Sequence, residues 1–285
     1  MSEPWRVDAH HHVWDLSARR HDWLDSPALA PIRRDFGLAD LAPATLAAGV
    51  DRTVVVQSLP EPDETAELLA LAAAPGPVTG VVGWVDLTAP DVPARLAELR
   101  RLPGGDRLVG IRHPVQSEAD PGWLTRPDVL RGLRAVGAAG LAYDLLVRPR
   151  QLPAALEAVR ACPEVTFVLD HLGQPPAADG EFTAWARHLG RLAAGERVFC
   201  KLSGLVTGAG RGAGTVAGLR PYAETAWEAF GAARVMFGSD WPVCLLAASY
   251  AEVAEVADRL CEGLSYGERT EVFRGTARRA YRLSF

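Results

Sequence analysis

Eight short apolar runs recur along this chain, and each is followed by turn residues and then by a segment with helical periodicity. Most of the runs are continuous in apolar character rather than alternating, which is typical of parallel strands buried on both faces. Helix candidates lie between them, for example at residues 64–74, 89–102, 126–140 and 152–162. The eight runs span residues 5–14, 53–59, 78–87, 108–116, 140–147, 165–173, 198–205 and 234–242.

This alternation of strand and helix predicts one α/β domain over residues 1–285, folded as a (β/α)8 barrel (TIM barrel). Eight such units need about 250 residues, and the chain has 285. A doubly wound sheet is the alternative. Its first strand would be followed by a glycine-rich turn that binds phosphate, and no such turn follows residues 5–14.

Two connections are longer than the few residues that usually join a strand to a helix. Residues 15–41 form the first, and the glycine-rich residues 206–219 form the second. Both follow strands, so a barrel would place them at its catalytic face, where long loops act as lids or pocket walls. A flexible surface loop is the alternative for residues 206–219.

The first run contains three consecutive histidines, His10, His11 and His12. Successive side chains of a strand point to opposite faces, so His10 and His12 share the inward face and His11 points away from it. Two imidazoles at that spacing can bind one divalent ion, or can hold a carbonyl group and a water by hydrogen bonds. We interpret His11 as a packed or partly exposed histidine between strand and helix.

Later runs also end in polar residues, and a barrel would bring these to the same mouth. His171 lies near the end of the sixth run, and Asp240 lies in the string FGSDWP at the eighth. A carboxylate at that position can act as a general base toward a water, with a helix N-cap as the alternative. The expected convergence of His10, His12, His171 and Asp240 predicts a catalytic site.

Composition excludes several classes of function. A net charge of −5 argues against a protein that binds nucleic acid or a membrane surface, and the sequence contains neither a signal peptide nor an apolar run of membrane length. The four cysteines are far apart, with no CxxC pair, which indicates reduced thiols. Lys201 is the only lysine among 30 basic residues. We expect a cytoplasmic enzyme.

The motifs resemble those of the amidohydrolase superfamily, which has HxH on the first strand, a histidine on a later strand and an aspartate on the last. Longer strings are similar to its lactonase branch, which includes L-fuconolactonase, L-rhamnonolactonase and 2-pyrone-4,6-dicarboxylate lactonase. The resemblance extends from about Val7 to Leu283. The strings are VDAHHHVWD, GIRHPVQ, LAYDLLVRPRQLP, FVLDHLGQPP, CKLSGLVT and FGSDWPVCLL.

The resemblance implies hydrolysis of a cyclic ester by a water that Asp240 activates, with His171 and the two inward histidines of the first strand completing the active site. It implies either no cofactor or one divalent ion, Zn or Mn, held by these same four residues, since both kinds of member are known. A two-metal site is not expected, because the fourth strand offers Arg112 and His113 where binuclear members have a bridging lysine.

Other polar residues near the mouth are candidates to bind substrate, and Arg112 is the first of them. A salt bridge or packing at the barrel rim is the alternative for each. Asp86 and Asp144 favour a sugar lactone with many hydroxyl groups over a dicarboxylated pyrone, which would need several arginines. The remaining candidates are Gln57, Trp84, His113, Tyr143, Asp144 and Arg34.

Three alternatives to a sugar lactonase stay open at this point. They are a lactonase of the 2-pyrone-4,6-dicarboxylate type, a metal-dependent decarboxylase of the same superfamily, and a barrel that binds sugar acids without turnover. In each case the expected partner is a small molecule, and neither a nucleic acid nor a membrane. The sequence leaves open whether the chain is a monomer or a homo-oligomer.

Overall fold

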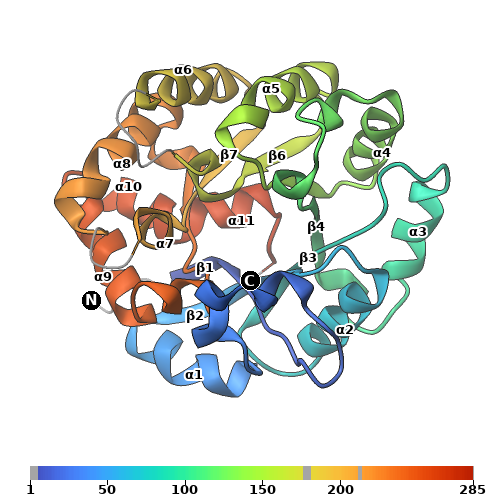
Figure 1. Cartoon of the computed structure of the whole chain (residues 1–285), viewed down its shortest axis with the longest axis horizontal. Coiled ribbons are helices and arrows are strands. Elements are labelled where there is room, and N and C mark those ends of the chain that lie inside the picture. Colours follow the sequence, from blue (N-terminus) through green and yellow to red (C-terminus); the bar gives the residue numbers. More distant parts are fainter. Residues whose placement is uncertain (1–5, 176–180, 211–213, 285) are drawn as a thin grey trace.

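The computed structural model describes residues 6–175, 181–210 and 214–284, which form one (β/α)8 barrel. The strands are β1 (Arg6–His11), β2 (Val50–Val56), β3 (Val78–Gly83), β4 (Leu108–His113), β5 (Ala142–Leu145), β6 (Thr166–Leu169), β7 (Val198–Leu202) and β8 (Val235–Phe237). They are parallel and lie side by side in the order β1 to β8. Figure 1 shows the strands in the middle of the molecule, with the helices in a ring around them.

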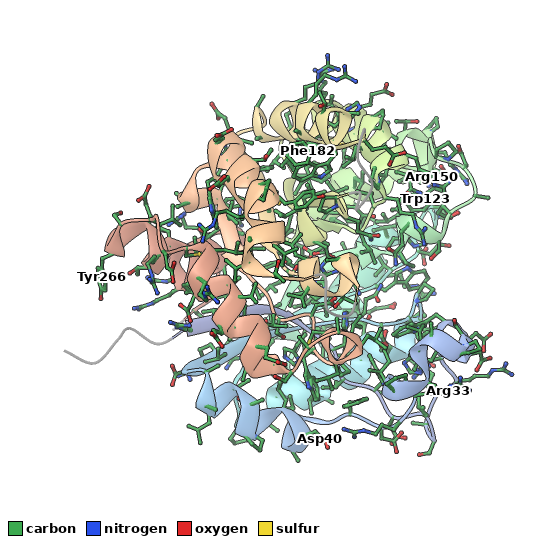
Figure 2. All side chains as sticks on the ribbon, turned by 60° about the vertical axis from the view of Figure 1, so that its left-hand side comes forward. Arg33, Asp40, Trp123, Arg150, Phe182 and Tyr266 are labelled. Carbon is green, nitrogen blue, oxygen red and sulfur yellow. The ribbon has the colours of Figure 1, made fainter. Side chains whose placement is uncertain are left out.

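The main helices are α1 (Leu38–Ala47), α2 (Pro62–Ala73), α3 (Val92–Leu99), α4 (Pro127–Ala138), α5 (Leu152–Ala161), α6 (Phe182–Ala193), α7 (Leu205–Ala209), α8 (Val216–Phe230), α9 (Tyr250–Leu260), α10 (Tyr266–Thr270) and α11 (Thr276–Ala280). Helices α2 to α5 each carry a proline in the first turn, where the missing N–H is not needed. Figure 2 shows Tyr266 of α10 at the outer edge of the molecule. Within the described ranges, no helix is long and apolar enough to cross a membrane.

The barrel closes through backbone contacts between β1 and the segment after β8. Asp240 N donates a hydrogen bond to His10 O over 2.8 Å, and His12 N donates to Trp241 O over 2.6 Å. Each segment donates one of these two hydrogen bonds, so the end of β1 lies directly beside Asp240.

Apolar side chains form two cores. The larger one packs the outward faces of the strands against the helices, and the smaller one fills the barrel interior. The C-terminal segment enters this interior at the end opposite the catalytic face, where Leu283 lies beside Gly80 near the beginning of β3. The interior core consists of Val7, Ala9, Val54, Val56, Val82, Ala142, Val168, Met236, Ala277, Ala280, Tyr281 and Leu283.

The predicted fold is confirmed, but every predicted run extends past the end of its strand. The additional residues form turns and short 3-10 helices, such as Val115–Ser117 after β4 and Asp170–Gly173 after β6. Polar residues such as His171 and Asp240 therefore belong to the loops, whereas His10, Arg112, Asp144 and Lys201 lie within the last residues of their strands. The four predicted helices correspond to α2, α3, α4 and α5.

The two long connections are largely ordered into short helices. Residues 15–41 contain two 3-10 helices, Asp22–Asp25 and Pro27–Ile32, followed by the beginning of α1. Residues 206–219 contain most of α7 and the beginning of α8, and residues 211–213 lie outside the described ranges.

Candidate active site

The structure brings the four predicted active-site residues together at the carboxyl ends of the strands. His10 and His12 lie at the end of β1, His171 follows β6, and Asp240 follows β8. Asp240 Oδ1 is 3.7 Å from His10 Nε2, 3.5 Å from His12 Nε2 and 3.9 Å from His171 Nε2. His10 Nε2 and His12 Nε2 are 3.2 Å apart. The site is thus one carboxylate oxygen faced by three imidazole nitrogens.

Two of these residues have a left-handed backbone conformation. The φ angle is +54° at His171 and +58° at Asp240, a region that costs about 1–3 kcal/mol for a residue with a side chain. Gly204 also has a positive φ, and a Cβ there would lie 2.8 Å from the His171 ring. Glycine is therefore required at position 204 for His171 to take this place.

Hydrogen bonds to the distal nitrogen orient two of the rings. His12 Nδ1 lies 2.8 Å from Val56 O. A carbonyl oxygen only accepts, so His12 Nδ1 carries a proton, and in the neutral ring Nε2 presents a lone pair to the site. His171 Nδ1 lies 2.8 Å from Ser203 Oγ. Both rings consequently turn Nε2 toward Asp240.

A cluster of buried charges lies behind the histidines. Lys201 Nζ is 2.6 Å from Asp144 Oδ2 and 2.9 Å from Asp170 Oδ1. Its third neighbour is His10 Nδ1, at 3.0 Å. Arg112 Nη1 lies 3.1 Å from Asp170 Oδ2 and 3.3 Å from His10 Nε2. Buried charges require partners, and here two cations balance two carboxylates.

Burial and these charges shift the pKa values of the cluster. Burial, and then the charge of Lys201, lowers the pKa of His10 well below its usual value, and burial lowers the pKa of His171. Both rings are therefore neutral near pH 7. Burial raises the pKa of Asp144 to about 6. In Asp170 the effect of burial is outweighed by the attraction of the charges on Lys201 and Arg112, so its pKa lies well below the usual value.

A pocket of about 880 Å³ opens onto this site, and His12, His171 and Asp240 line it. The first long connection contributes Trp23, and the second contributes Thr207. Both connections therefore form walls of the pocket, and their action as lids stays a prediction. The polar lining includes Gln57, Ser58, Gln116, Ser117, Gln174 and Thr207.

Of the seven residues predicted to bind substrate, Arg112 and Gln57 line the pocket. They are bonded to each other, since Gln57 Nε2 donates to Arg112 O over 3.0 Å and the Arg112 guanidinium donates to Gln57 O. This mutual contact holds both side chains in place before a substrate arrives.

The other five predicted substrate ligands do not line the pocket. Trp84 Nε1 donates to His113 Nδ1 over 3.0 Å, and His113 stacks on Trp123 at a centroid distance of 4.3 Å. Figure 2 labels Trp123 at the side of the barrel opposite Tyr266. Tyr143 is fully buried in the core between strands and helices. These residues pack the outer face of β4 and its neighbours.

Asp144 and Arg34 are also engaged elsewhere. Asp144 is fully buried and accepts hydrogen bonds from Lys201 and from Tyr281 OH, the latter over 2.7 Å. Arg34 has a side chain that is 57% exposed, and its guanidinium lies over the Phe36 ring at 3.7 Å. The expectation that all seven residues face a substrate is thus corrected to Arg112 and Gln57.

His11 agrees with its interpretation as a packed histidine. It is fully buried, neither ring nitrogen has a hydrogen-bond partner in the described part of the chain, and burial lowers its pKa to about 3. The residues that sequence reasoning did not assign to the site are Asp170, Lys201 and Ser203. Two features of the sequence could have pointed to them: they lie next to the ends of the sixth and seventh strands, and the chain has no other lysine.

The donor set fits a divalent cation. Zinc with bonds of about 2.1 Å separates neighbouring ligand atoms by about 3.4 Å, close to the separations among His10 Nε2, His12 Nε2 and Asp240 Oδ1, which are 3.2, 3.5 and 3.7 Å. His171 belongs to a second group, with His10 and Asp170. One feature opposes a cation, namely the Arg112 guanidinium 3.3 Å from His10 Nε2.

An HxH pair, a later histidine and a last-strand aspartate at the mouth of a (β/α)8 barrel define a hydrolase-type site in which water is activated by a carboxylate or a metal ion. The protein-family model described as Amidohydrolase matches residues 7–283. The chain belongs to this amidohydrolase family.

Named relatives and solved structures cover almost the whole chain. It is 41% identical over 282 residues to L-fucono-1,5-lactonase of Burkholderia ambifaria, which covers 98% of this chain and 96% of that protein. An amidohydrolase from Burkholderia multivorans with bound zinc has a TM-score of 0.92 at 39% identity, over 99% of this chain and 100% of that one. A Pseudomonas putida protein named for 2-pyrone-4,6-dicarboxylic acid hydrolysis has a TM-score of 0.80 at 25% identity, over 99% and 98% of the two chains.

Proposed function

We propose that this chain hydrolyses a sugar lactone, with an aldonolactone of the L-fucono-1,5-lactone type as substrate. The observation that carries this proposal is the meeting of three imidazole Nε2 atoms within 3.9 Å of Asp240 Oδ1 at the pocket. The 41% identity to the Burkholderia ambifaria L-fucono-1,5-lactonase over nearly the whole chain supports the substrate class.

Asp240 is the general base. A water between Asp240 and the neutral His171 is hydrogen-bonded by both, and the pocket presents the lactone carbonyl to it. As the water oxygen bonds to the carbonyl carbon, one water proton passes to Asp240 Oδ1. Ser203 holds the distal nitrogen of His171 over 2.8 Å, which fixes the ring and hence the water.

The carbonyl oxygen becomes an oxyanion in this step and is stabilised by the His10 ring at the end of β1, with the Arg112 guanidinium 3.3 Å from His10 Nε2. The bond between the former carbonyl carbon and the ring oxygen then breaks. Protonated Asp240 gives its proton to the departing ring oxygen, so the product is an open-chain hydroxy acid and Asp240 returns to the carboxylate.

When a divalent ion such as zinc or manganese is bound, His10, His12 and Asp240 would hold it, and it would supply Lewis-acid polarisation of the carbonyl. In the structure Asp240 Oδ1 lies 3.9 Å from His171 Nε2, and the Arg112 guanidinium is paired with Asp170 over 3.1 Å.

The pocket lining favours a polyhydroxylated substrate. Amide and hydroxyl groups of Gln57, Gln116 and Ser117 can donate to and accept from sugar hydroxyls. A dicarboxylated pyrone would need several available arginines, whereas Arg112 is already engaged by Asp170. These amides replace Asp144 as the reason to prefer a sugar, because Asp144 is buried against Lys201.

The test is Asp240→Asn, assayed on a panel of aldonolactones with a pH indicator, with and without chelator. Asparagine has nearly the same shape but cannot accept the proton, so kcat should fall by about 10²–10⁴-fold. The matched control is Asp86→Asn, at an exposed loop position that bonds Thr88 and does not line the pocket. This control should keep the activity of the wild-type protein.

Other outcomes would replace the proposal. Near-normal hydrolysis by Asp240→Asn would contradict the mechanism. Faster opening of 2-pyrone-4,6-dicarboxylate than of any aldonolactone would assign the chain to that activity, and release of CO2 from aromatic acids would make it a decarboxylase. Binding of sugar acids with no turnover of any lactone would identify a binding barrel.

A further inference from the structure

Lys201 lies in β7, fully buried, and is the only lysine in a chain that otherwise uses arginine. An ammonium group has three N–H donors and no lone pair. Its contact with His10 Nδ1 at 3.0 Å is therefore a hydrogen bond only if that nitrogen carries no proton. The position of Lys201 thus bears directly on the tautomer of an active-site histidine.

The second nitrogen of His10 supports the same assignment. A neutral ring with an unprotonated Nδ1 carries its proton on Nε2. His10 Nε2 faces His12 Nε2 at 3.2 Å, and His12 Nε2 is a lone pair because His12 Nδ1 donates to Val56 O. Lys201 then donates a hydrogen bond to His10, His10 donates to His12, and His12 donates to the carbonyl oxygen of Val56. Every donor in this chain has an acceptor.

The competing tautomer, with the proton on His10 Nδ1, fits less well. Its N–H would point at an ammonium group 3.0 Å away, and the other acceptor within reach, Asp170 Oδ1 at 3.3 Å, already faces Lys201 Nζ at 2.9 Å. In this competing tautomer His10 Nε2 would accept one hydrogen bond, from Arg112 Nη1 at 3.3 Å. In exchange, the lone pairs of His10 Nε2 and His12 Nε2 would face each other at 3.2 Å.

We propose that Lys201 is a positioning residue that holds His10 as the Nε2–H tautomer. The consequence for catalysis rests on the proposed function, because in this tautomer His10 donates a hydrogen bond to the lactone carbonyl oxygen without a metal ion. The consequence for metal binding does not rest on the proposed function. A cation held by His10, His12 and Asp240 needs a lone pair on His10 Nε2 and hence a proton on Nδ1, where Lys201 lies. Lys201 therefore weakens the affinity of this site for divalent cations.

The tautomer can be read in the wild-type protein. Nitrogen-15 NMR of histidine-labelled protein at pH 7, with the His10 signals assigned by their loss in His10→Asn, should show an unprotonated Nδ1 and a protonated Nε2. A protonated Nδ1 in the metal-free protein would overturn the proposal. Because the tautomer is read in the unmodified chain, the result does not depend on the stability of Lys201→Met.

The second arm is the affinity of Lys201→Met for zinc, measured by calorimetry beside the wild-type protein. Removal of the ammonium should tighten zinc binding about tenfold and lower kcat about tenfold with little change in KM. The matched control is Tyr281→Phe, which removes the 2.7 Å hydrogen bond to Asp144 Oδ2 in the same cluster without a bond to His10. It should behave like the wild-type protein in both assays.

Unchanged or weaker zinc affinity in folded Lys201→Met would contradict the proposal. Loss of a nearby positive charge by itself also favours cation binding, and the nitrogen-15 measurement separates that effect from the tautomer. Failure of the proposed function is distinguishable from this result. A wild-type protein that opens no lactone would refute the lactonase activity, and the tautomer and zinc measurements would stand on their own.

Discussion

At the scale of single residues, backbone strain marks the site. Five described residues other than glycine have a positive φ, and His171 and Asp240 are two of them. Such conformations persist only where the surroundings enforce them. The hydrogen bond from Asp240 N to His10 O enforces the conformation of Asp240. The absence of a side chain at Gly204 leaves room for the ring of His171.

Two glycines with the same backbone conformation should respond differently to substitution. Gly204 and Gly49 have φ values of +68° and +65°, but a Cβ would touch the His171 ring only at Gly204, whereas nothing lies within 4 Å at Gly49. Alanine at either position should cost about 1 kcal/mol of unfolding free energy through φ strain. Only Gly204→Ala should also lose kcat, by about tenfold or more, because it displaces His171.

Chemical denaturation and lactone kinetics on both variants check this prediction. Equal kcat values for Gly204→Ala and Gly49→Ala would show that the His171 ring tolerates displacement. Gly204 would then have no part in placing the ring for catalysis.

At the scale of elements, strand alternation decides which predicted residues reach the pocket. It was applied correctly to β1, where His10 and His12 point inward and His11 outward. The same rule limits β4 to Arg112 and β5 to Asp144 on the inner side, and it sends His113 and Tyr143 into the outer core. The sequence therefore predicted the convergence of strand ends well, but it overcounted the ligands wherever two polar residues stand side by side.

The outward position of His113 has a consequence for stability against pH. Burial lowers the pKa of His113 below its usual 6.5, and protonation of Nδ1 would remove the acceptor of Trp84 Nε1–H. As the pH falls below 6.5, the unfolded chain takes up this proton first. The stability that neutral His113 contributes is thus present above pH 6.5 and is lost below it.

Replacement of His113 by phenylalanine should keep the stacking on Trp123 and remove this titration. Urea unfolding at several pH values between 5 and 8 should give a free energy that declines less steeply toward acid in His113→Phe than in the wild-type protein. Parallel declines would mean that His113 titrates alike in the folded and unfolded chains.

At the scale of the whole molecule, the regular alternation of strands and helices was sufficient to predict a barrel, because parallel strands with short crossovers have few other ways to close. The filling of the barrel could not be predicted in the same way. The apolar residues of α11 and the C-terminal segment have the spacing of any amphipathic helix, and nothing in that spacing tells whether they cover the outside or enter the interior. The buried Lys201 cluster is equally invisible, since it joins residues from four strands and from the turn after β6.

The C-terminal segment supplies a large share of the interior core, so its truncation should lower stability without touching the catalytic face. Leu283 is 4% exposed and packs in the barrel interior, where a Cβ at Gly80 would lie 3.1 Å from Leu283 Cδ2. Leu283→Ala should reduce the unfolding free energy by about 3 kcal/mol through lost burial and the cavity left behind. Leu46→Ala is the matched control, because Leu46 is 81% exposed on α1 and should change stability by less than about 0.5 kcal/mol. Both variants should retain the wild-type kcat per folded molecule at 25 °C. A loss of kcat in folded Leu283→Ala would mean that the interior core sets the geometry of the mouth as well as the stability of the barrel.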